Sequence, residues 1–488
     1  MAWYEIFILG LYLLIMLMLF IYSMGQLHLT FAYLKARKRK EESTPTLKKH
    51  PFITVQLPIY NEKYVIERLI DSVCQLDYPN SKLEIQVLDD STDESVKMVA
   101  AKIKEHQEKG INIQHLQRPE RTGFKAGALE YGLKKAKGEY IAIFDADFLP
   151  PSNFLIKTIP HFNNDNIGVV QTRWGHINKE YSLFTKVQAF ALNAHFSVEQ
   201  TGRSFSKSFI NFNGTGGVWR KSCIKDAGGW SAETLTEDLD LSYRAQIKGW
   251  KFKYLEEIES PAELPVLMPA IKSQQYRWNK GAAETAVKNL GKIFKSSLPV
   301  QTKLHATFHL LNSSIFVLLL IGGIISLPVL YIKYLHPEID FYFHIASILL
   351  IGFMSIGFFF WVSTKKAPYT KSTDRFIPSF FTFMTISMGL SYHNAMAVLE
   401  GLLGKKTPFI RTPKFNSTSK GAKISGNKYL SRKVDGNTLI ELLLGVYFMA
   451  GIVLAYYIKD IGLVPFHLML SIGLLTVSYQ SIKGARYA

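Results

Sequence analysis

The chain has 488 residues, of which 48% are hydrophobic and 20% are charged, and its formal net charge is +18. This length is sufficient for a large domain and additional elements. The excess of positive charge lies beside apolar segments rather than in a nucleic-acid-binding pattern, which argues against nucleic acid as a partner. The two cysteines, Cys74 and Cys223, offer no disulfide framework, as is usual in a reducing compartment.

Six stretches of the chain contain no Asp, Glu, Lys or Arg. They are residues 6–34, 304–332, 341–364, 376–399, 442–458 and 461–482. A spanning helix needs about 20 mostly apolar residues, so most of these stretches are candidates to cross a bilayer. The first has no basic segment before it and no cleavage site after it, which favours a retained helix over a signal peptide.

Basic residues indicate the orientation of the chain in the membrane. Lys35, Arg37 and Lys38 directly follow the first apolar stretch, whereas only Glu5 precedes it. The positive-inside rule therefore places the N-terminus outside and the segment after residue 34 in the cytosol. We expect an integral protein of a bacterial inner or plasma membrane, with lipids as partners.

The stretch at 376–399 is the exception among the apolar segments. If it spanned, the strongly basic loop after it would lie outside, against the charge rule. It also carries Ser387, Ser391 and Asn394 at helical spacing on one face. We therefore expect an interfacial or re-entrant helix here and five spanning helices, with a full sixth span as the alternative.

The expected organisation follows from these segments. It comprises a transmembrane helix at 1–34, a basic linker at 35–50, a cytosolic domain at 51–303, two transmembrane helices at 304–364, an interfacial or re-entrant helix at 376–404, a cytosolic loop at 405–436 and two transmembrane helices at 437–488.

The cytosolic segment alternates strand and helix patterns. The β-rich runs "FITVQLPIY", "LEIQVLDDS", "INIQHL" and "YIAIFDADFLP" are separated by helical patterns. This βαβαβαβ order predicts a doubly wound α/β domain with an open, mostly parallel sheet. Ligands of such sheets bind beyond the carboxyl ends of the strands, where "LDDSTD" and "FDAD" are located, so we expect a nucleotide site there.

Asp145 and Asp147 in "FDAD" are candidates to bind a metal. Their side chains leave the end of a strand on the same face, and two such close carboxylates repel unless a cation lies between them. Mg²⁺ or Mn²⁺ bound to a diphosphate would supply that cation. The alternative is a polar turn, which is the better interpretation of an isolated D-x-D motif.

Three other acidic or basic sites have both a structural and a functional interpretation. Asp89 and Asp90 could cap the next helix or contact a nucleoside. Lys125 lies at a glycine-marked helix start that favours an anion, or is a solvated lysine. Asp238, in "LTEDLDLSYR", could take a proton from an attacking hydroxyl, while Thr236 or Glu237 could instead cap the helix.

The stretch "SQQYRWNKGAAE" places Gln274, Arg277 and Trp278 at i, i+3 and i+4, hence on one helix face. An amide, a guanidinium and an indole suit a diphosphate and a sugar ring, because arginine binds phosphate oxygens in a bidentate way and tryptophan stacks on a pyranose. The alternative is an amphipathic helix with a tryptophan anchored at the membrane interface.

The order Asp-Asp, Asp-x-Asp, Thr-Glu-Asp, Gln-x-x-Arg-Trp, with flanking apolar helices, resembles the processive membrane family 2 glycosyltransferases, which include cellulose, mannan and hyaluronan synthases. "TEDLDLSYRAQIKGWKF", "PAELP" and "QQYRW" look most similar to plant mannan and glucan synthase-like enzymes and their bacterial relatives. The resemblance implies a cytosolic GT-A-type domain and inverting transfer of a hexose from a nucleotide sugar to a growing β-linked glycan.

The resemblance also implies roles for individual residues in each part of the site. Nucleotide-sugar contacts are expected from Asp89, Asp90, Lys125, Asp145, Pro58, Tyr60 and Glu62, metal binding from Asp145 and Asp147, catalysis from Asp238 beside Glu237, and acceptor and diphosphate binding from Gln274, Arg277 and Trp278. The loop "TPFIRTPKF" is similar to the family's gating loop at Phe409, Thr412 and Lys414, with Arg411 in place of the usual valine. Its alternative is a basic loop on anionic lipid. From their positions, Trp174 and Gly214 are expected near the acceptor.

The expected partners are UDP-glucose or GDP-mannose, the growing glycan, Mg²⁺ or Mn²⁺, and envelope export proteins. The chain ends at Ala488, soon after the last apolar stretch, so we expect no cyclic-dinucleotide-binding domain of the bacterial cellulose synthase kind. The main alternative function is transfer of one sugar to a lipid, as in ceramide glucosyltransferase. A transporter is disfavoured because the expected spans contain no ionisable residues except histidines such as His309 and His344.

Overall fold

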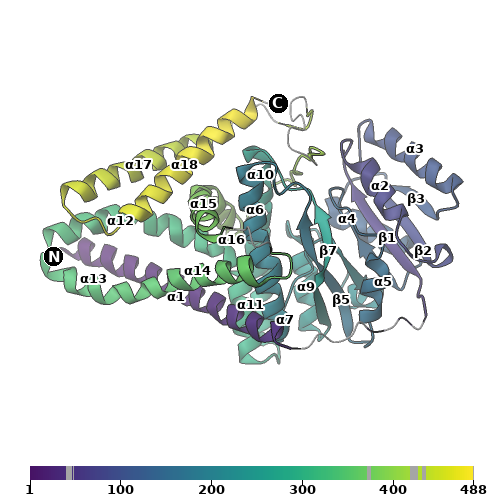
Figure 1. The fold of residues 1–488 in the computed structure, drawn as a ribbon, viewed down its shortest axis with the longest axis horizontal. Coiled ribbons are helices and arrows are strands. Elements are labelled where there is room, and N and C mark those ends of the chain that lie inside the picture. The colour runs from purple at the N-terminus through teal and green to yellow at the C-terminus, as the bar shows by residue number, and fades with distance from the viewer. Residues whose placement is uncertain are drawn as a thin grey trace.

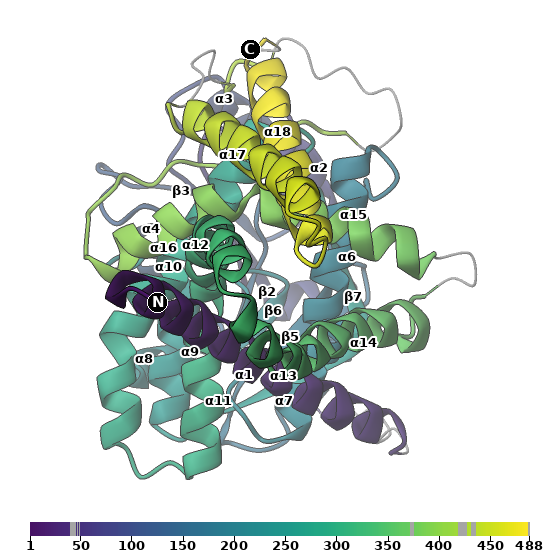
Figure 2. The same cartoon turned by 90° about the vertical axis from the view of Figure 1, so that its left-hand side faces the viewer.

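The computed structural model describes residues 1–39, 45, 47, 49–370, 375–417, 427–430 and 436–486. Parts of the expected basic linker at 35–50 and of the loop at 405–436 lie outside the described residues. An α/β domain and a group of long apolar helices lie side by side, on the right and left of Figure 1 respectively. Viewed from the helical side, these helices lie in front of the sheet (Figure 2).

A seven-stranded sheet forms the centre of the α/β domain. Its strands are β1 (Ile53–Ile59), β2 (Leu83–Asp89), β3 (Ile113–Gln117), β4 (Tyr140–Ile143), β5 (Ile167–His176), β6 (Gly217–Arg220) and β7 (Lys251–Ala262), in the order β3-β2-β1-β4-β6-β5-β7. Strands β1 to β4 are parallel, which confirms the expected mostly parallel sheet. Strand β6 runs antiparallel to β4 and β5, so the complete sheet is mixed.

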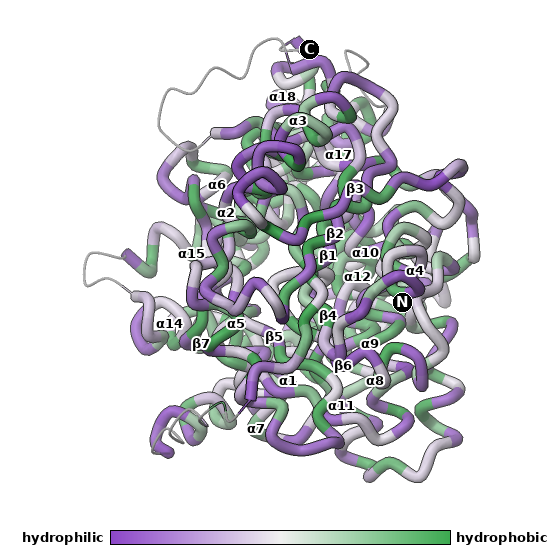
Figure 3. The backbone as a smooth tube through the Cα atoms, turned by 90° about the vertical axis from the view of Figure 1, so that its right-hand side faces the viewer, coloured by the Kyte–Doolittle hydropathy of each residue, from purple (hydrophilic) through white to green (hydrophobic). Residues whose placement is uncertain are grey.

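Helices cover both faces of this sheet. On one face, α2 (Ile66–Cys74), α3 (Ser95–Glu108) and α5 (Phe154–Thr158) share an apolar core with the strands; on the other, α4 (Phe124–Lys135), α8 (Lys221–Asp226) and α9 (Glu237–Ile247) do so. Burial on both faces explains why the strands read as nearly continuous apolar runs. In Figure 3 the hydrophobic colour follows the central strands and the hydrophilic colour is prominent around them.

A second set of helices joins the α/β domain to the apolar helices. It comprises α6 (Leu183–Ala194), a π-helical turn (His195–Glu199), α7 (Gln200–Phe205), α10 (Met268–Lys295), α11 (Val300–Leu310) and α16 (Ser391–Leu402). Helix α10 packs along α16. The contact is close because a Cβ on Gly401 would lie only 2.7 Å from the carbonyl oxygen of Lys280.

The apolar helices are α1 (Trp3–Arg37), α12 (Ile315–Leu335), α13 (Asp340–Ala346), α14 (Leu350–Lys366), α15 (Phe376–Gly389), α17 (Asn437–Tyr457) and α18 (Val464–Ala485). Four segments of the described chain are long and apolar enough to cross a membrane: Trp3–Arg37, Asn312–Leu335, Pro337–Lys366 and Asn437–Tyr457. A buried ion pair of 2.7 Å between Lys272 of α10 and Glu441 of α17 connects this group to the α/β domain.

The structure departs from the expected organisation in two segments. Instead of one helix at 376–404, it has α15 and α16, separated at Leu390. Helix α15 has 14 residues, about 21 Å of helix, which is short of a bilayer core of about 30 Å. Near the break, Gly389 meets Gly473 of α18, where a Cβ would lie 2.3 Å from the opposing carbonyl oxygen. The fifth expected span, at 461–482, corresponds to α18, which packs against α17 but is not among the four spanning candidates.

Candidate active site

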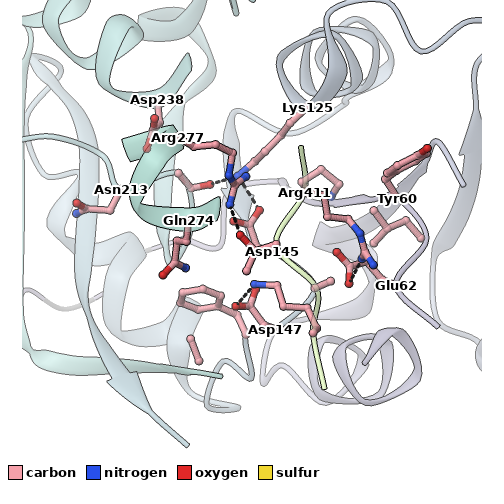
Figure 4. Close-up of a pocket in the computed structure, with 18 of the residues that line it drawn as sticks. Tyr60, Glu62, Lys125, Asp145, Asp147, Asn213, Asp238, Gln274, Arg277 and Arg411 are labelled. Atoms are coloured by element: carbon pink, nitrogen blue, oxygen red, sulfur yellow. Dashed lines mark hydrogen bonds and ion pairs between the residues drawn. The ribbon is translucent and has the colours of Figure 1, made fainter. Parts of the chain in front are cut away.

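An open cleft lies at the carboxyl ends of β1 and β4, where the loop at 405–417 crosses the α/β domain (Figure 4). It is open to solvent, and both polar and apolar side chains line it, as is usual for a ligand-binding cleft. The residues suggested by the sequence that line it are Pro58, Tyr60, Glu62, Asp90, Lys125, Asp145, Asp147, Trp174, Gly214, Glu237, Asp238, Gln274, Arg277, Trp278, Phe409, Thr412 and Lys414.

Among the site residues suggested by the sequence, Asp89 alone does not line the cleft. It is 2% exposed, and its carboxylate pairs with the ring of His115 at 2.8 Å and accepts the Ser91 N–H at 2.8 Å. The neighbouring Asp90 faces the cleft and is held by a bidentate pair with Arg118, at 2.6 and 2.7 Å. Asp89 therefore stabilises the end of β2, and Asp90 is the member of the pair placed to meet a ligand.

The acidic pair after β4 is neutralised by two ammonium groups. The Asp145 carboxylate lies 2.6 Å from Lys125 Nζ, and Asp147 lies 2.5 Å from Lys414 Nζ, as the dashed lines in Figure 4 show. The backbone N–H of Asp145 donates to Thr215 Oγ1 at 2.9 Å, which fixes the turn. A positively charged group therefore lies in front of each carboxylate, which is where a bound cation would lie.

Gly214 forms the wall between the acidic pair and Asp238. Its carbonyl oxygen accepts a hydrogen bond from Lys125 Nζ at 2.9 Å, and its φ is +78°. A Cβ at this position would lie 3.1 Å from Asp238 Oδ2 and 3.4 Å from Lys125 Nζ. Glycine therefore permits the left-handed backbone and keeps open the space in front of the Asp238 carboxylate.

Asp238 lies in the first turn of α9, with its side chain directed toward the cleft (Figure 4). The N-cap residue Thr236 makes no side-chain capping hydrogen bond, so this segment is not a capping box. Burial and the adjacent Glu237 raise the pKa of Asp238 well above its usual range, while Lys125 partly opposes them. A carboxylate with a raised pKa is a stronger proton acceptor, as a general base requires.

Helix α10 directs Gln274, Arg277 and Trp278 into the same cleft. Arg277 donates to Thr412 Oγ1 at 2.7 Å, and its guanidinium lies 4.8 Å from the centre of the Phe409 ring. The indole of Trp278 lies 6.4 Å from that of Trp174 on β5. The helix therefore brings a cationic group and an aromatic surface into the cleft that Asp238 and the acidic pair also line.

The loop at 405–417 contacts the nucleotide side of the cleft. Phe409 stacks on Phe124 with ring centroids 5.7 Å apart. Arg411, which replaces the valine usual in the resembled family, forms an ion pair of 2.6 Å with Glu62 after β1. Burial raises the pKa of Glu62 to about 7, with Arg411 acting in the opposite direction. The substitution at 411 therefore supplies a polar contact within this cleft.

The part of the cleft around Trp174 contains groups that the sequence interpretation did not single out. His176 lies two residues after Trp174 on β5 and shares its face, and Leu192 and Asn213 complete this side. The indole N–H of Trp174 is buried without a hydrogen-bond partner, and the buried ring of His176 lies beside the Asn193 side chain. Burial, followed by Arg173, lowers the pKa of His176 to about 3, so its ring is neutral.

Two further residues of the nucleotide side were also missed. The Arg121 guanidinium lies 3.4 Å from the centre of the Tyr60 ring, and Glu263 follows β7. They stand in the stretches "RTGFKAGAL" and "PAELP", yet neither repeats a spacing typical of a site. The alternation of Trp174 and His176 along a strand is the signal that would have placed His176 in the cleft beside Trp174.

An α/β fold with a cleft at its strand ends, an acidic pair and a candidate base fits a transferase that uses a sugar nucleotide. The family model described as "Glycosyltransferase like family 2" matches residues 50–281. A mannosyltransferase from Pyrobaculum calidifontis, solved with GDP-Man and Mn²⁺, has a similar fold, with a TM-score of 0.56 and 18% identity over 81% of this chain and 100% of that one. This confirms the GT-A-type fold.

Curated plant relatives are more similar in sequence. A probable glucomannan 4-beta-mannosyltransferase of Oryza sativa subsp. japonica is 36% identical over 423 residues, 83% of this chain and 74% of the relative. Another from the same species is 44% identical over 282 residues, 57% of this chain and 51% of the relative. The glucomannan 4-beta-mannosyltransferase 2 of Arabidopsis thaliana is 36% identical over 392 residues, 77% of this chain and 69% of the relative.

The chain belongs to the family 2 glycosyltransferases, within the cellulose synthase-like group that includes the glucomannan 4-beta-mannosyltransferases. Its four helices of spanning length make it a membrane protein. The matched region covers about half of one rice relative and about three quarters of the other.

Proposed function

We propose that this glycosyltransferase elongates a β-1,4-linked mannan or glucomannan chain, with GDP-mannose as the donor. The observation that carries the proposal is that Asp238, the acidic pair and the neighbouring indoles of Trp174 and Trp278 all line one cleft. The names of the curated relatives support mannose as the transferred sugar. The apolar helices support a membrane site, with the α/β domain on the cytosolic side.

The nucleotide end of the donor would bind between β1 and α4. Tyr60, Asp90 and Arg121 offer an aromatic ring, a carboxylate and a guanidinium for the base and ribose. The diphosphate would then lie near Lys125, which pairs with Asp145, and near Arg277, which comes from another helix and feels the charge of both aspartates. Both cations are half-buried, so their interaction with a diphosphate is less screened than at an exposed surface.

The residues present suit a divalent cation of the hard, oxygen-binding kind. Asp145 and Asp147 supply carboxylate oxygens, and each is compensated by a lysine ammonium. No group of three or more His, Cys, Asp or Glu suited to a metal occurs in the described part of the chain, so donor phosphates would have to complete the coordination. Bound Mg²⁺ or Mn²⁺ would neutralise charge on the leaving diphosphate.

The transfer itself requires a base on the acceptor side. Asp238 would accept the proton of the acceptor hydroxyl while that oxygen bonds to the anomeric carbon. The bond between the anomeric carbon and the phosphate oxygen breaks on the opposite face, so the configuration inverts. Lys125 and Arg277 would stabilise the negative charge that develops on the departing GDP.

The acceptor glycan would bind against the paired indoles. Trp278 and Trp174 offer faces for pyranose rings, and the unpartnered Trp174 N–H and the His176 ring can exchange hydrogen bonds with sugar hydroxyls. A neutral imidazole donates at one nitrogen and accepts at the other, which matches the donor and acceptor capacity of a hydroxyl.

The proposal is tested with membranes containing the protein and with labelled GDP-mannose and UDP-glucose in parallel. We expect a polymer from GDP-mannose that β-mannanase digests, and no such product from the Asp238→Asn variant. If label enters polymer only from UDP-glucose and only β-glucanase releases it, the proposed donor is wrong. If the label remains in a single-sugar lipid, elongation itself is refuted.

A further inference from the structure

Glu263 lies where the end of β7, the acidic pair and the loop at 405–417 meet. Its backbone N–H donates to the carbonyl oxygen of Asp147 at 3.2 Å, so its position is tied to the acidic pair. The residue is only 4% exposed, and a carboxylate that is so deeply buried requires compensating donors.

Those donors come from the loop and from α2. Glu263 Oε1 accepts from the Phe415 N–H at 3.0 Å, the Ser417 N–H at 3.2 Å and the Ser417 hydroxyl at 3.1 Å. Its other oxygen accepts from Arg68 at 2.6 Å, and Arg68 also donates to the Asn416 side chain at 2.6 Å. Three consecutive loop residues are therefore fastened to the α/β domain through one carboxylate and its arginine.

A further contact strengthens the same attachment. Asn178 donates to the Ser417 hydroxyl at 3.1 Å and to the Leu264 carbonyl oxygen at 2.9 Å, so it bridges the loop and the residue after Glu263. The Asn178 side chain also accepts from the Leu264 N–H at 2.8 Å. Residues 415–417 are thus held by several hydrogen bonds to Glu263, Arg68 and Asn178.

The contacts that the loop makes inside the cleft all precede this attachment. Arg411 pairs with Glu62, Thr412 accepts from Arg277, and Lys414 pairs with Asp147. Lys414 directly precedes Phe415, and consecutive Cα atoms are about 3.8 Å apart. Because Phe415 is fixed by Glu263, the region that the Lys414 ammonium can reach is limited.

We propose that Glu263 is a positioning residue that holds residues 415–417 as a fixed hinge, about which residues 409–414 move when a nucleotide sugar enters. The inference relies on the proposed function only for the ligand. A diphosphate with its cation needs the Asp147 carboxylate, so Lys414 must leave it. The hinge contacts need not change, because the Glu263 carboxylate already receives four hydrogen bonds.

Two substitutions of Glu263 distinguish its contacts with the loop from its contact with Arg68. Glu263→Ala removes every side-chain contact, whereas Glu263→Gln keeps an amide oxygen for the loop but presents an NH₂ group to Arg68. Buried hydrogen bonds to a charged acceptor are strong, so we expect hydrogen exchange at the Phe415 and Ser417 amides to rise about ten- to hundred-fold in Glu263→Ala and less in Glu263→Gln. The KM for GDP-mannose should rise with a smaller change in kcat, because Thr412 no longer holds the Arg277 guanidinium that the proposed function places near the diphosphate.

The test is hydrogen exchange followed by mass spectrometry on the full-length protein in lipid nanodiscs without substrate. Glu257→Ala is the matched control, because Glu257 lies on β7, the strand that leads to Glu263, and pairs with the distant Arg37 at 2.7 Å. Ser417→Ala tests the hinge from the loop side if Glu263→Ala also loosens β7.

The expected result is faster exchange across 407–417 in Glu263→Ala and Ser417→Ala and unchanged exchange in Glu257→Ala. Equal exchange in wild type and both hinge variants would overturn the proposal, as would an equal rise in Glu257→Ala. Exchange is measured without substrate, so the hinge can fail while mannan synthesis stands. Conversely, the hinge would survive if the donor proved to be another sugar nucleotide.

Discussion

Gly214→Ala is the substitution for which the structure gives the most specific expectation. The residue has φ +78°, a conformation that costs an L-residue roughly 1–2 kcal/mol. Its new Cβ would lie 3.1 Å from Asp238 Oδ2, so the carboxylate must shift by a few tenths of an ångström and the methyl group would occupy the space of the acceptor hydroxyl. A misplacement of about 1 Å can cost about a hundred-fold in rate, so we expect turnover to fall about ten- to hundred-fold.

Gly249→Ala provides a matched control. Gly249 has φ +96°, and a Cβ there would meet nothing within 4 Å. Both variants should therefore lose roughly the same stability, measured as the thermal midpoint in detergent, while only Gly214→Ala should lose turnover with GDP-mannose. Equal turnover in the two variants would refute the assignment of Asp238 and of the space in front of it.

Three other expectations concern catalysis and the metal, and a fourth concerns the acceptor. Asp238→Asn should abolish transfer and leave GDP-mannose binding measurable by calorimetry; wild-type turnover would exclude Asp238 as the base. The pKa of Asp238 is raised, and protonated Asp238 accepts no proton. We therefore expect kcat/KM to decline as the pH falls through a value well above the usual 3.9 or so of an aspartate. A pH profile that stays flat down to about pH 5 would contradict this. Chelation should stop transfer, and Asp147→Asn should raise the Mn²⁺ concentration needed for half-maximal rate. Full activity in the presence of chelator would show that transfer needs no metal. His176→Phe should raise the KM for a short mannan acceptor about ten-fold and leave the KM for GDP-mannose unchanged. An equal rise in the KM for GDP-mannose would show that His176 does not act on the acceptor alone.

The parallel half of the sheet could be predicted from sequence because its order of strands and helices is local. Strands β1 to β4 alternate with helices along the chain, and Asp90 and Asp145 fall at their carboxyl ends by that order alone. The antiparallel β6 has only four residues, Gly217–Arg220, and its place between β4 and β5 depends on long-range pairing that no local pattern records.

The site shows the same division between local and long-range information. Gln274, Arg277 and Trp278 share a face by helical spacing, so their common direction was predictable. Asp89 and Asp90 could not be distinguished, because which of them is buried depends on His115 from the neighbouring strand β3 and on Arg118. The role of Glu263 was likewise invisible, because its partners at 415–417 lie more than 150 positions further along the chain, 152 for Phe415 and 154 for Ser417.

Product length under single-hit conditions tests the central claim most directly. Purified protein in nanodiscs, given labelled GDP-mannose, a divalent cation and acceptor in large excess over enzyme, is stopped after few turnovers and the product is sized. A chain-elongating mannosyltransferase that retains its acceptor against Trp174 and Trp278 should yield long β-mannanase-sensitive chains beside unused acceptor. A product extended by one mannose on every acceptor, or a single-mannose lipid, would contradict the account.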